Sequence, residues 1–163
     1  MNWESKLRTL LSAVNAGEFG DEWIGFVPEP PLQPNEISKL AGEAGITLPP
    51  SLFVLYTIAN GMLIGVCFRV GGLGSTADEQ LGMLNREFLL YIRESCESHV
   101  IELLFGSEGY TGDLLCLTAQ GSVVTLDIRN PRTGTFVASS LDSFFDDVCL
   151  GSGYLSYDPR GDL

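Results

Sequence analysis

The only histidine of the chain, His99, would have to serve in any Ser–His or Cys–His pair that activates a nucleophile. It lies in the run Glu97-Ser98-His99-Val100, which is typical of a junction between a helix and a strand and contains no recognisable nucleophile motif. We therefore interpret His99 as a surface histidine with ordinary hydrogen-bond partners. Catalysis by a pair of carboxylates stays open, because no spacing among the 21 acidic residues singles out a pair.

Four cysteines are the next candidates for chemistry, and they stand far apart at irregular spacing: Cys67, Cys96, Cys116 and Cys149. This spacing matches neither a Cys-x-x-Cys metal site nor a compact disulfide framework. Each cysteine lies among apolar residues, so the sequence predicts reduced, buried thiols that behave as small hydrophobic side chains. We expect no metal and no cofactor.

The run Gly71-Gly72-Leu73-Gly74 resembles a phosphate-binding loop only in part. It lacks the Lys and the Ser or Thr of a P-loop, and it lacks the full spacing of a dinucleotide-binding motif. The net charge of −12 also gives a bound anion little help. We interpret the run as a turn.

Charge is the strongest signal of the composition, with 21 acidic residues against 9 basic ones and a sequence pI near 4.2. Residues 1–99 hold 12 acids and 6 bases and residues 100–163 hold 9 and 3, so each part carries −6 and the acidity is general. Nucleic acids and anionic membranes are therefore poor partners. The charge serves either solubility alone or the attraction of a basic macromolecule, and the sequence leaves both open.

The length of 163 residues favours one domain with a single substantial core. No apolar run approaches the roughly 20 residues that span a bilayer. The N-terminus is not a basic region followed by an apolar one, as a signal peptide would be. We expect a cytoplasmic protein.

Hydrophobic periodicity and turn residues predict an order of helices and strands. Asn35 and Thr76 are expected to cap the second and fourth helices, and Gly106 to Gly112 is expected to connect two strands. Short turns in the second half indicate an antiparallel meander. The expected helices are 2–16, 35–44, 49–59, one that starts at 76 and one that starts at 140, and the expected strands are 62–70, 100–105, 114–118, 123–128 and 135–138.

The stretch from Gly45 to Gly61 is the most informative part of the chain. Gly45 can close one helix, Pro49-Pro50 can start the next, and Asn60-Gly61 can end it. The apolar residues between them cover much of the helix surface, which predicts a buried helix. Leu48, Phe53, Leu55 and Tyr56 should belong to the core.

Three segments in this order resemble the SUKH superfamily, the Smi/Knr-like domain. The first is Gly-x-x-Leu-Pro at Gly45 followed by an apolar helix that closes with Asn60-Gly61. The second is a pair of strands, 112–117 and 123–127. A Gly-Asp step begins the first strand, and an acidic residue ends the second. The third is the run 138–145, in which small residues, Ser, an apolar residue and an acid precede two Phe. Together they cover roughly residues 35–150.

The resemblance implies a single α+β domain whose central, mostly antiparallel β-sheet is flanked by about four helices. Residues 35–150 would form the SUKH-like core, with 1–34 as an N-terminal helix and Pro-rich connection of the same domain and 151–163 as a C-terminal tail. It also implies a protein that is not an enzyme and has no catalytic residues.

For function, the resemblance implies a bacterial immunity protein that binds and neutralises a cognate toxin domain, which the acidity suggests is basic and possibly a nuclease. The alternative is a regulatory protein–protein interaction module of the Smi/Knr type outside toxin defence. We expect a monomer or weak dimer. The partner-binding candidates are carboxylates chosen for expected exposure, although Asp113 and Asp127 could equally cap turns: Glu87, Glu94, Glu97, Glu102, Glu108, Asp113 and Asp127.

Overall fold

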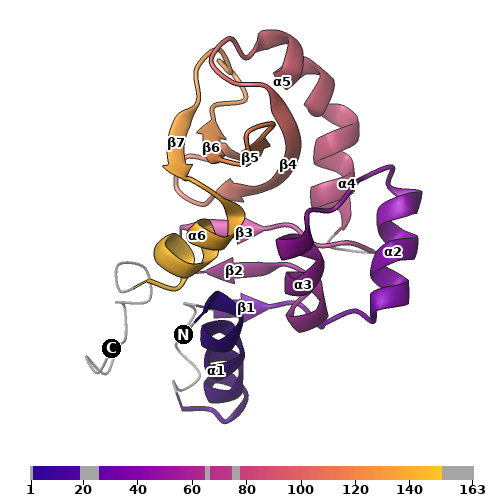
Figure 1. Cartoon of the computed structure of the whole chain (residues 1–163), viewed down its shortest axis with the longest axis vertical. Helices are drawn as coiled ribbons and strands as arrows, with labels where there is room; N and C mark the ends of the chain where they lie inside the picture. Colours follow the sequence, from indigo (N-terminus) through magenta and orange to yellow (C-terminus); the bar gives the residue numbers. More distant parts are fainter. Residues whose placement is uncertain (1, 19–25, 65–66, 75–77, 152–163) are drawn as a thin grey trace.

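Each strand of this protein pairs with the strand that follows it along the chain, and every pairing is antiparallel. A computed structural model describes residues 2–18, 26–64, 67–74 and 78–151, which form a single α+β domain with a seven-stranded open sheet and six α-helices (Figure 1). The strands are β1 (Phe26–Pro28), β2 (Met62–Ile64), β3 (Phe68–Val70), β4 (Ile101–Glu108), β5 (Leu114–Thr118), β6 (Val123–Leu126) and β7 (Thr135–Ala138). The helices are α1 (Trp3–Asn15), α2 (Pro34–Glu43), α3 (Pro50–Ile58), α4 (Asp78–Glu87), α5 (Leu89–Ser95), α6 (Leu141–Ser143) and a final π-helix, η1 (Phe144–Cys149).

The antiparallel meander of the second half is confirmed, but the first half differs from the prediction. The expected strand 62–70 is a hairpin of β2 and β3, in which Met62 lies opposite Val70. The Pro-rich connection contributes β1, which pairs with β2. The reversal was missed because the run 62–68 contains no charged residue, no Pro, Asn or Asp, and only one Gly, so its apolar pattern reads as a single strand.

The helices are more numerous than the four or so expected, mainly because two predicted helices are divided. Phe88 separates α4 from α5, yet its N–H bonds to the Leu84 carbonyl and its carbonyl accepts from Ile92, each at 2.9 Å. The predicted helix is therefore a bent pair whose hydrogen bonding continues. In the same way, α6 passes into the π-helix after Ser143.

Helix starts were predicted with mixed success. Ser140 caps α6 as expected and accepts a hydrogen bond from Ser143 N at 3.0 Å. Asn35 is not the cap of α2, because Pro34 occupies the first helical position and Gln33 takes the cap. The predicted cap at Thr76 lies outside the described residues, as does the predicted tail beyond Gly151.

Strand β4 continues through Gly106, where the sequence predicted a connection. A Cβ at this position would lie 2.1 Å from the carbonyl oxygen of Arg69 on β3. Gly106 is therefore needed for the close approach of two strands, and it does not end β4. Register shifts on both sides of Leu103–Leu104 bend the strand, and β4 to β7 curl strongly (Figure 1).

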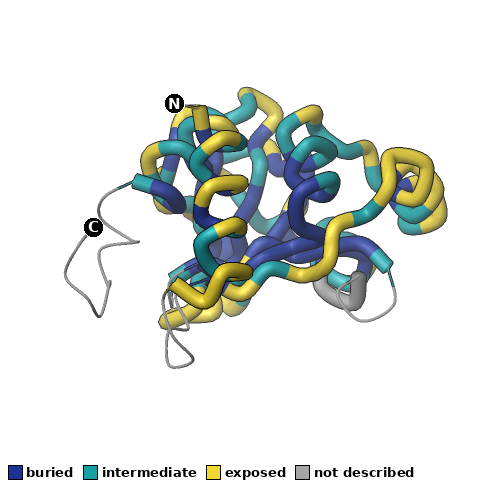
Figure 2. Tube along the Cα trace, turned by 90° about the horizontal axis from the view of Figure 1, so that it is seen from below, coloured by how far each residue is buried: buried dark blue, intermediate teal, exposed yellow. Residues whose placement is uncertain are grey.

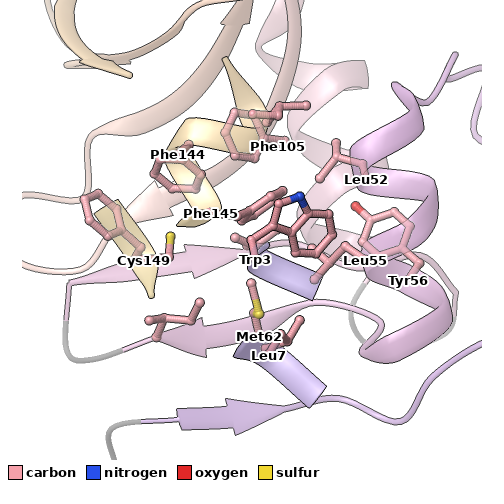
Figure 3. Close-up of a cluster of buried hydrophobic side chains, with 14 of the residues drawn as sticks. Trp3, Leu7, Leu52, Leu55, Tyr56, Met62, Phe105, Phe144, Phe145 and Cys149 are labelled. Carbon is pink, nitrogen blue, oxygen red and sulfur yellow. The ribbon is translucent and has the colours of Figure 1, made fainter. Parts of the chain in front are cut away.

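The main core lies between the sheet and the helices α1, α3 and α6 with η1. Two aromatic residues of η1 join its parts (Figure 3): Phe144 packs edge-on against Phe68 and Phe105 at centroid distances of 5.3 and 5.7 Å, and Phe145 lies 4.9 Å from Trp3. The predicted core residues behave as expected, since Leu55 and Tyr56 are fully buried and Leu48 and Phe53 pack against the cluster. The buried residues follow the sheet and the inner sides of the helices (Figure 2).

A second core lies between α4, α5 and the strands β4, β5 and β6. Ile92, Leu104, Cys116, Val124 and Leu126 are fully buried in it. Because β4 contributes Phe105 to the main core and Leu104 to the second, this strand is covered on both faces. The two cores fix α4 and α5 relative to α3.

The end of α3 is joined to the segment after β3 by a buried polar contact. The Asn60 side chain donates to the Leu73 carbonyl and accepts from Leu73 N at 2.7 Å, and the Tyr56 hydroxyl donates to the Gly71 carbonyl at 2.8 Å. The backbones touch here, because a Cβ at Gly72 would lie 2.1 Å from the Asn60 carbonyl oxygen. We call this contact the Asn60 junction.

We predict that Gly72→Ala lowers the free energy of unfolding by about 3 kcal/mol or more, since its Cβ overlaps backbone that cannot move alone. The matched control is Gly42→Ala in α2, where the added Cβ meets no atom within 4 Å. This control should raise stability by up to about 1 kcal/mol, because Ala favours the helical backbone over Gly and position 42 lies in the last turn of α2. Urea denaturation of both variants checks the prediction, and a Gly72→Ala midpoint equal to that of the wild type would contradict it.

Candidate functional site

The seven predicted partner-binding carboxylates divide between two parts of the molecule. Glu108, Asp113 and Asp127 lie at one end of the strands β4, β5 and β6, where Leu114 is opposite Leu126. We call them the turn carboxylates. The others lie on or beside α4, α5 and the start of β4, and we call them the helix-side carboxylates: Glu87, Glu94, Glu97 and Glu102.

Glu108 organises the turn between β4 and β5. Its carboxylate accepts hydrogen bonds from Thr111 Oγ1 at 2.6 Å, Thr111 N at 2.7 Å and Tyr110 N at 3.1 Å. Partial burial by itself raises the pKa of Glu108, but these hydrogen bonds outweigh it and hold the pKa below the ordinary value of 4.5. Much of the hydrogen-bond-accepting capacity of this carboxylate is therefore used within its own turn.

Asp127 holds the start of the β6–β7 connection. It accepts from the backbone N of Arg129 at 2.9 Å and from Arg129 Nε at 3.1 Å. These two hydrogen bonds, with the charge of Arg129, lower the pKa of Asp127. This geometry agrees with the alternative that Asp127 caps a turn. The backbone of Asp113 closes the neighbouring turn, since its carbonyl accepts from Glu108 N at 2.7 Å.

The helix-side carboxylates are more available. Glu87, Glu94 and Glu102 are exposed, and within the described part of the chain their carboxylates have no hydrogen-bond or ion-pair partner. Glu97 is exposed too, but it pairs with Arg132 at 3.0 Å. The structure thus brings three free carboxylates onto three adjacent elements and separates them from the turn carboxylates.

A clasp between residues 97–99 and 132–134 includes the histidine. Glu97 N donates to the Arg132 carbonyl at 2.9 Å, and Gly134 N donates to Ser98 Oγ at 2.9 Å. Ser98 Oγ also lies 2.7 Å from His99 Nδ1, a contact that the sequence analysis did not anticipate. Because the hydroxyl already holds Gly134, we interpret the Ser98–His99 contact as part of this clasp between two connections.

The glycine run after β3 uses two of its backbone N–H groups in hydrogen bonds inside the protein. Gly71 N donates to the Phe105 carbonyl at 2.9 Å, and Leu73 N is held by the Asn60 side chain. Gly71, Gly72 and Leu73 are buried. These groups cannot cradle a phosphate, and the close approach at the Asn60 junction explains why Gly stands at position 72.

All four cysteines are free, but only two of them are buried as the sequence predicted. Cys116 and Cys149 are buried, and burial raises the pKa of both thiols. Cys67 and Cys96 are only partly buried. Across the ranges described, no three or more His, Cys, Asp or Glu side chains gather where they could hold a metal ion.

Sequence reasoning missed a groove between the α2–α3 connection, α4, α5, β4 and the end of β5. Its volume is about 740 Å³, and its charged lining residues are Arg86, Arg93 and Glu102. The available signal in the sequence was the spacing of Arg86 and Arg93, which are seven residues apart on one predicted helix and so lie on the same helix face. The sequence analysis did not use it, because it considered only the carboxylates of this segment as binding candidates.

No protein-family model matches the chain, and no curated protein is significantly similar to it. None of the helices in the described ranges is both long and apolar enough to cross a bilayer.

We predict that Glu108→Gln destabilises the protein at neutral pH and that the difference from the wild type disappears in acid. A folded-state pKa below 4.5 means that the ionised Glu108 adds stability above about pH 4.5, and this contribution is lost as the pH falls through the lowered value. Urea midpoints measured from about pH 7 down to about pH 2.5 test this prediction.

Glu94→Gln is the matched control for this measurement, since the Glu94 carboxylate has no described partner. Its midpoints should follow those of the wild type. A constant difference between Glu108→Gln and the wild type at all pH values would show that the carboxylate does not act through its charge.

Proposed function

We propose that this chain is a non-catalytic immunity protein of the SUKH type, which binds a basic toxin domain in the cytosol and neutralises it by occlusion. The observation that carries the proposal is the set of free, exposed helix-side carboxylates Glu87, Glu94 and Glu102 on a chain of net charge −12. Carboxylates without internal partners are free to pair with cations of another protein.

The charge acts first on the rate of encounter. A surface of one sign attracts a partner of the opposite sign and can raise the association rate by orders of magnitude at low salt. If the toxin is a nuclease, its active site must attract phosphates, and carboxylates at similar spacing would occupy the same cationic groups. Binding of this kind requires no chemistry from the immunity protein.

Two parts of the fold also support the proposal. Gly45 has a φ of +69° and ends α2, Pro50 begins α3, and Asn60 with Gly61 ends it, so the first segment of the resemblance forms a rigid corner of the domain. The clasp at residues 97–99 and the second core hold α5 on the sheet. The acidic side chains are therefore displayed on ordered elements.

We predict that the double variant Glu87→Lys/Glu94→Lys weakens binding to the toxin domain encoded beside this gene by at least about 10-fold. Charge reversal at two free carboxylates replaces attraction by repulsion at the contact, and about 1.4 kcal/mol corresponds to each factor of 10. Isothermal titration calorimetry gives the affinity, and survival on co-expression with the toxin gives the protection.

The matched control is Glu29→Lys/Asp147→Lys, which changes the net charge by the same amount at exposed positions away from α4 and α5. It should retain most of the affinity and all of the protection. Equal losses in both double variants would show that only the total charge matters. If the wild-type protein forms no complex with the toxin and gives no protection, the proposal is wrong, and the alternative of a regulatory protein–protein interaction module is favoured.

A further inference from the structure

The groove missed by the sequence analysis has the size of a ligand site. Its volume of about 740 Å³ falls within the roughly 300–1,000 Å³ typical of binding pockets. The connection from α2 to α3 arches across α4 (Figure 1), and the same connection and α4 form two of its walls. The other walls are α5, the start of β4 and the turn after β5.

Apolar side chains form much of the lining. Ile46 and Leu48 come from the α2–α3 connection, Leu89 from α5, and Leu103 and Leu117 from β4 and β5. Of these only Leu103 is buried, and the other four are partly exposed and line the groove. An apolar ligand group placed here would remove that surface from water.

Charge in the groove is opposite in sign to that of the chain as a whole. Two guanidinium groups and one carboxylate among the lining residues give a local charge of +1, against −12 for the protein. The groove therefore favours an acidic group even though the molecular surface as a whole repels one.

The two arginines differ in how they are held. Arg93 donates from Nε to the Ile101 carbonyl at 2.7 Å and from Nη2 to the Glu102 carbonyl at 2.9 Å, which leaves its other N–H groups unused. Arg86 has no hydrogen-bond or ion-pair partner within the residues that the structure describes. Its Nη1 would lie 3.1 Å from a Cβ at Gly82, so the missing side chain makes room for the guanidinium along α4.

The α2–α3 connection also offers free backbone groups. Thr47 and Leu48 belong to no helix or strand, and among the described residues their backbone N–H and carbonyl groups have no hydrogen-bond partner. An extended peptide satisfies such groups with its own main chain, which a lipid or a simple organic acid does not.

We propose that this groove binds an extended peptide segment of another protein that carries an acidic side chain next to apolar ones. The peptide carboxylate pairs with Arg86 and with the unused donors of Arg93. Its apolar side chains pack on Leu48 and Leu89, and its main chain bonds to Thr47 and Leu48. This proposal goes beyond the proposed function: Glu102 belongs to both surfaces, but the test of the groove uses no toxin, so the two proposals can fail separately.

A peptide-display selection with the full chain as target tests the proposal. From a random heptapeptide library, we expect enrichment of Asp or Glu beside Leu, Ile, Val or Phe. Arg86→Glu should abolish this enrichment and weaken the best selected peptide at least 10-fold, as measured by fluorescence polarisation. Replacement of the acid by Lys in that peptide should weaken its binding to the wild type to a similar extent and restore part of the binding to Arg86→Glu.

The matched control is Arg8→Glu, which makes the same change of charge at an exposed position on α1, outside the groove. It should select the same peptides as the wild type. Binding of the best peptide should also slow hydrogen exchange at the Thr47 and Leu48 amides several-fold. A selection without acidic residues, equal results for Arg86→Glu and the wild type, or unchanged exchange at both amides would overturn the proposal.

Discussion

The side chain of Asn60 makes the hydrogen bonds to the segment after β3 that the backbone of a neighbouring strand would otherwise make. Its amide group satisfies both the N–H and the carbonyl of Leu73 inside the protein, where an unpaired polar group would cost about 1–3 kcal/mol. The contact works only because Gly72 lets the two backbones touch. It fixes where α3 ends relative to β3, and Tyr56 adds a second bond to the same segment. The packing of α3 on the sheet, and with it the main core, depends on this junction.

Strand β4 connects this packing with the core on the other side of the sheet. One of its faces completes the main core and the other forms the second core beneath α4 and α5. Asn85 reinforces the second connection, since its amide donates to the Leu104 carbonyl at 2.7 Å and accepts from Leu104 N at 3.1 Å. An asparagine side chain thus pairs with a backbone at two places in the fold. The second of these, together with Arg93, holds the α4–α5 wall of the groove against β4.

The elements with strong local signals were predictable from sequence, and the contacts that depend on tertiary neighbours were not. Gly45, the Pro pair and Asn60-Gly61 mark the ends of α2 and α3 because caps and turns act over a few residues. Gly72 and Gly106 carry no such local signal. Their role is a close approach to residues distant in sequence, so Gly106 was misread as part of a turn. The candidate carboxylates were predicted as exposed. Whether a carboxylate is hydrogen-bonded within its own turn, as that of Glu108 is, depends on turn geometry that the composition does not reveal.

Acidic and basic side chains of α4 and α5 follow each other directly, and this order bears on how one side of the domain can recognise a partner. Glu87 and Glu94 stand next to Arg86 and Arg93 in the sequence, but of these four residues the two arginines line the groove and the two glutamates do not. At physiological salt, charges are screened beyond about 8 Å, so a distant partner responds to the net charge and a bound one to the groups it touches. A protein that is basic overall would be attracted by the carboxylates, while an acidic, apolar segment of the same protein could occupy the groove. In that case, reversing the charge of either Glu87 or Arg86 would weaken the binding of the same partner. If two separate partners are bound, each reversal would affect only one of them.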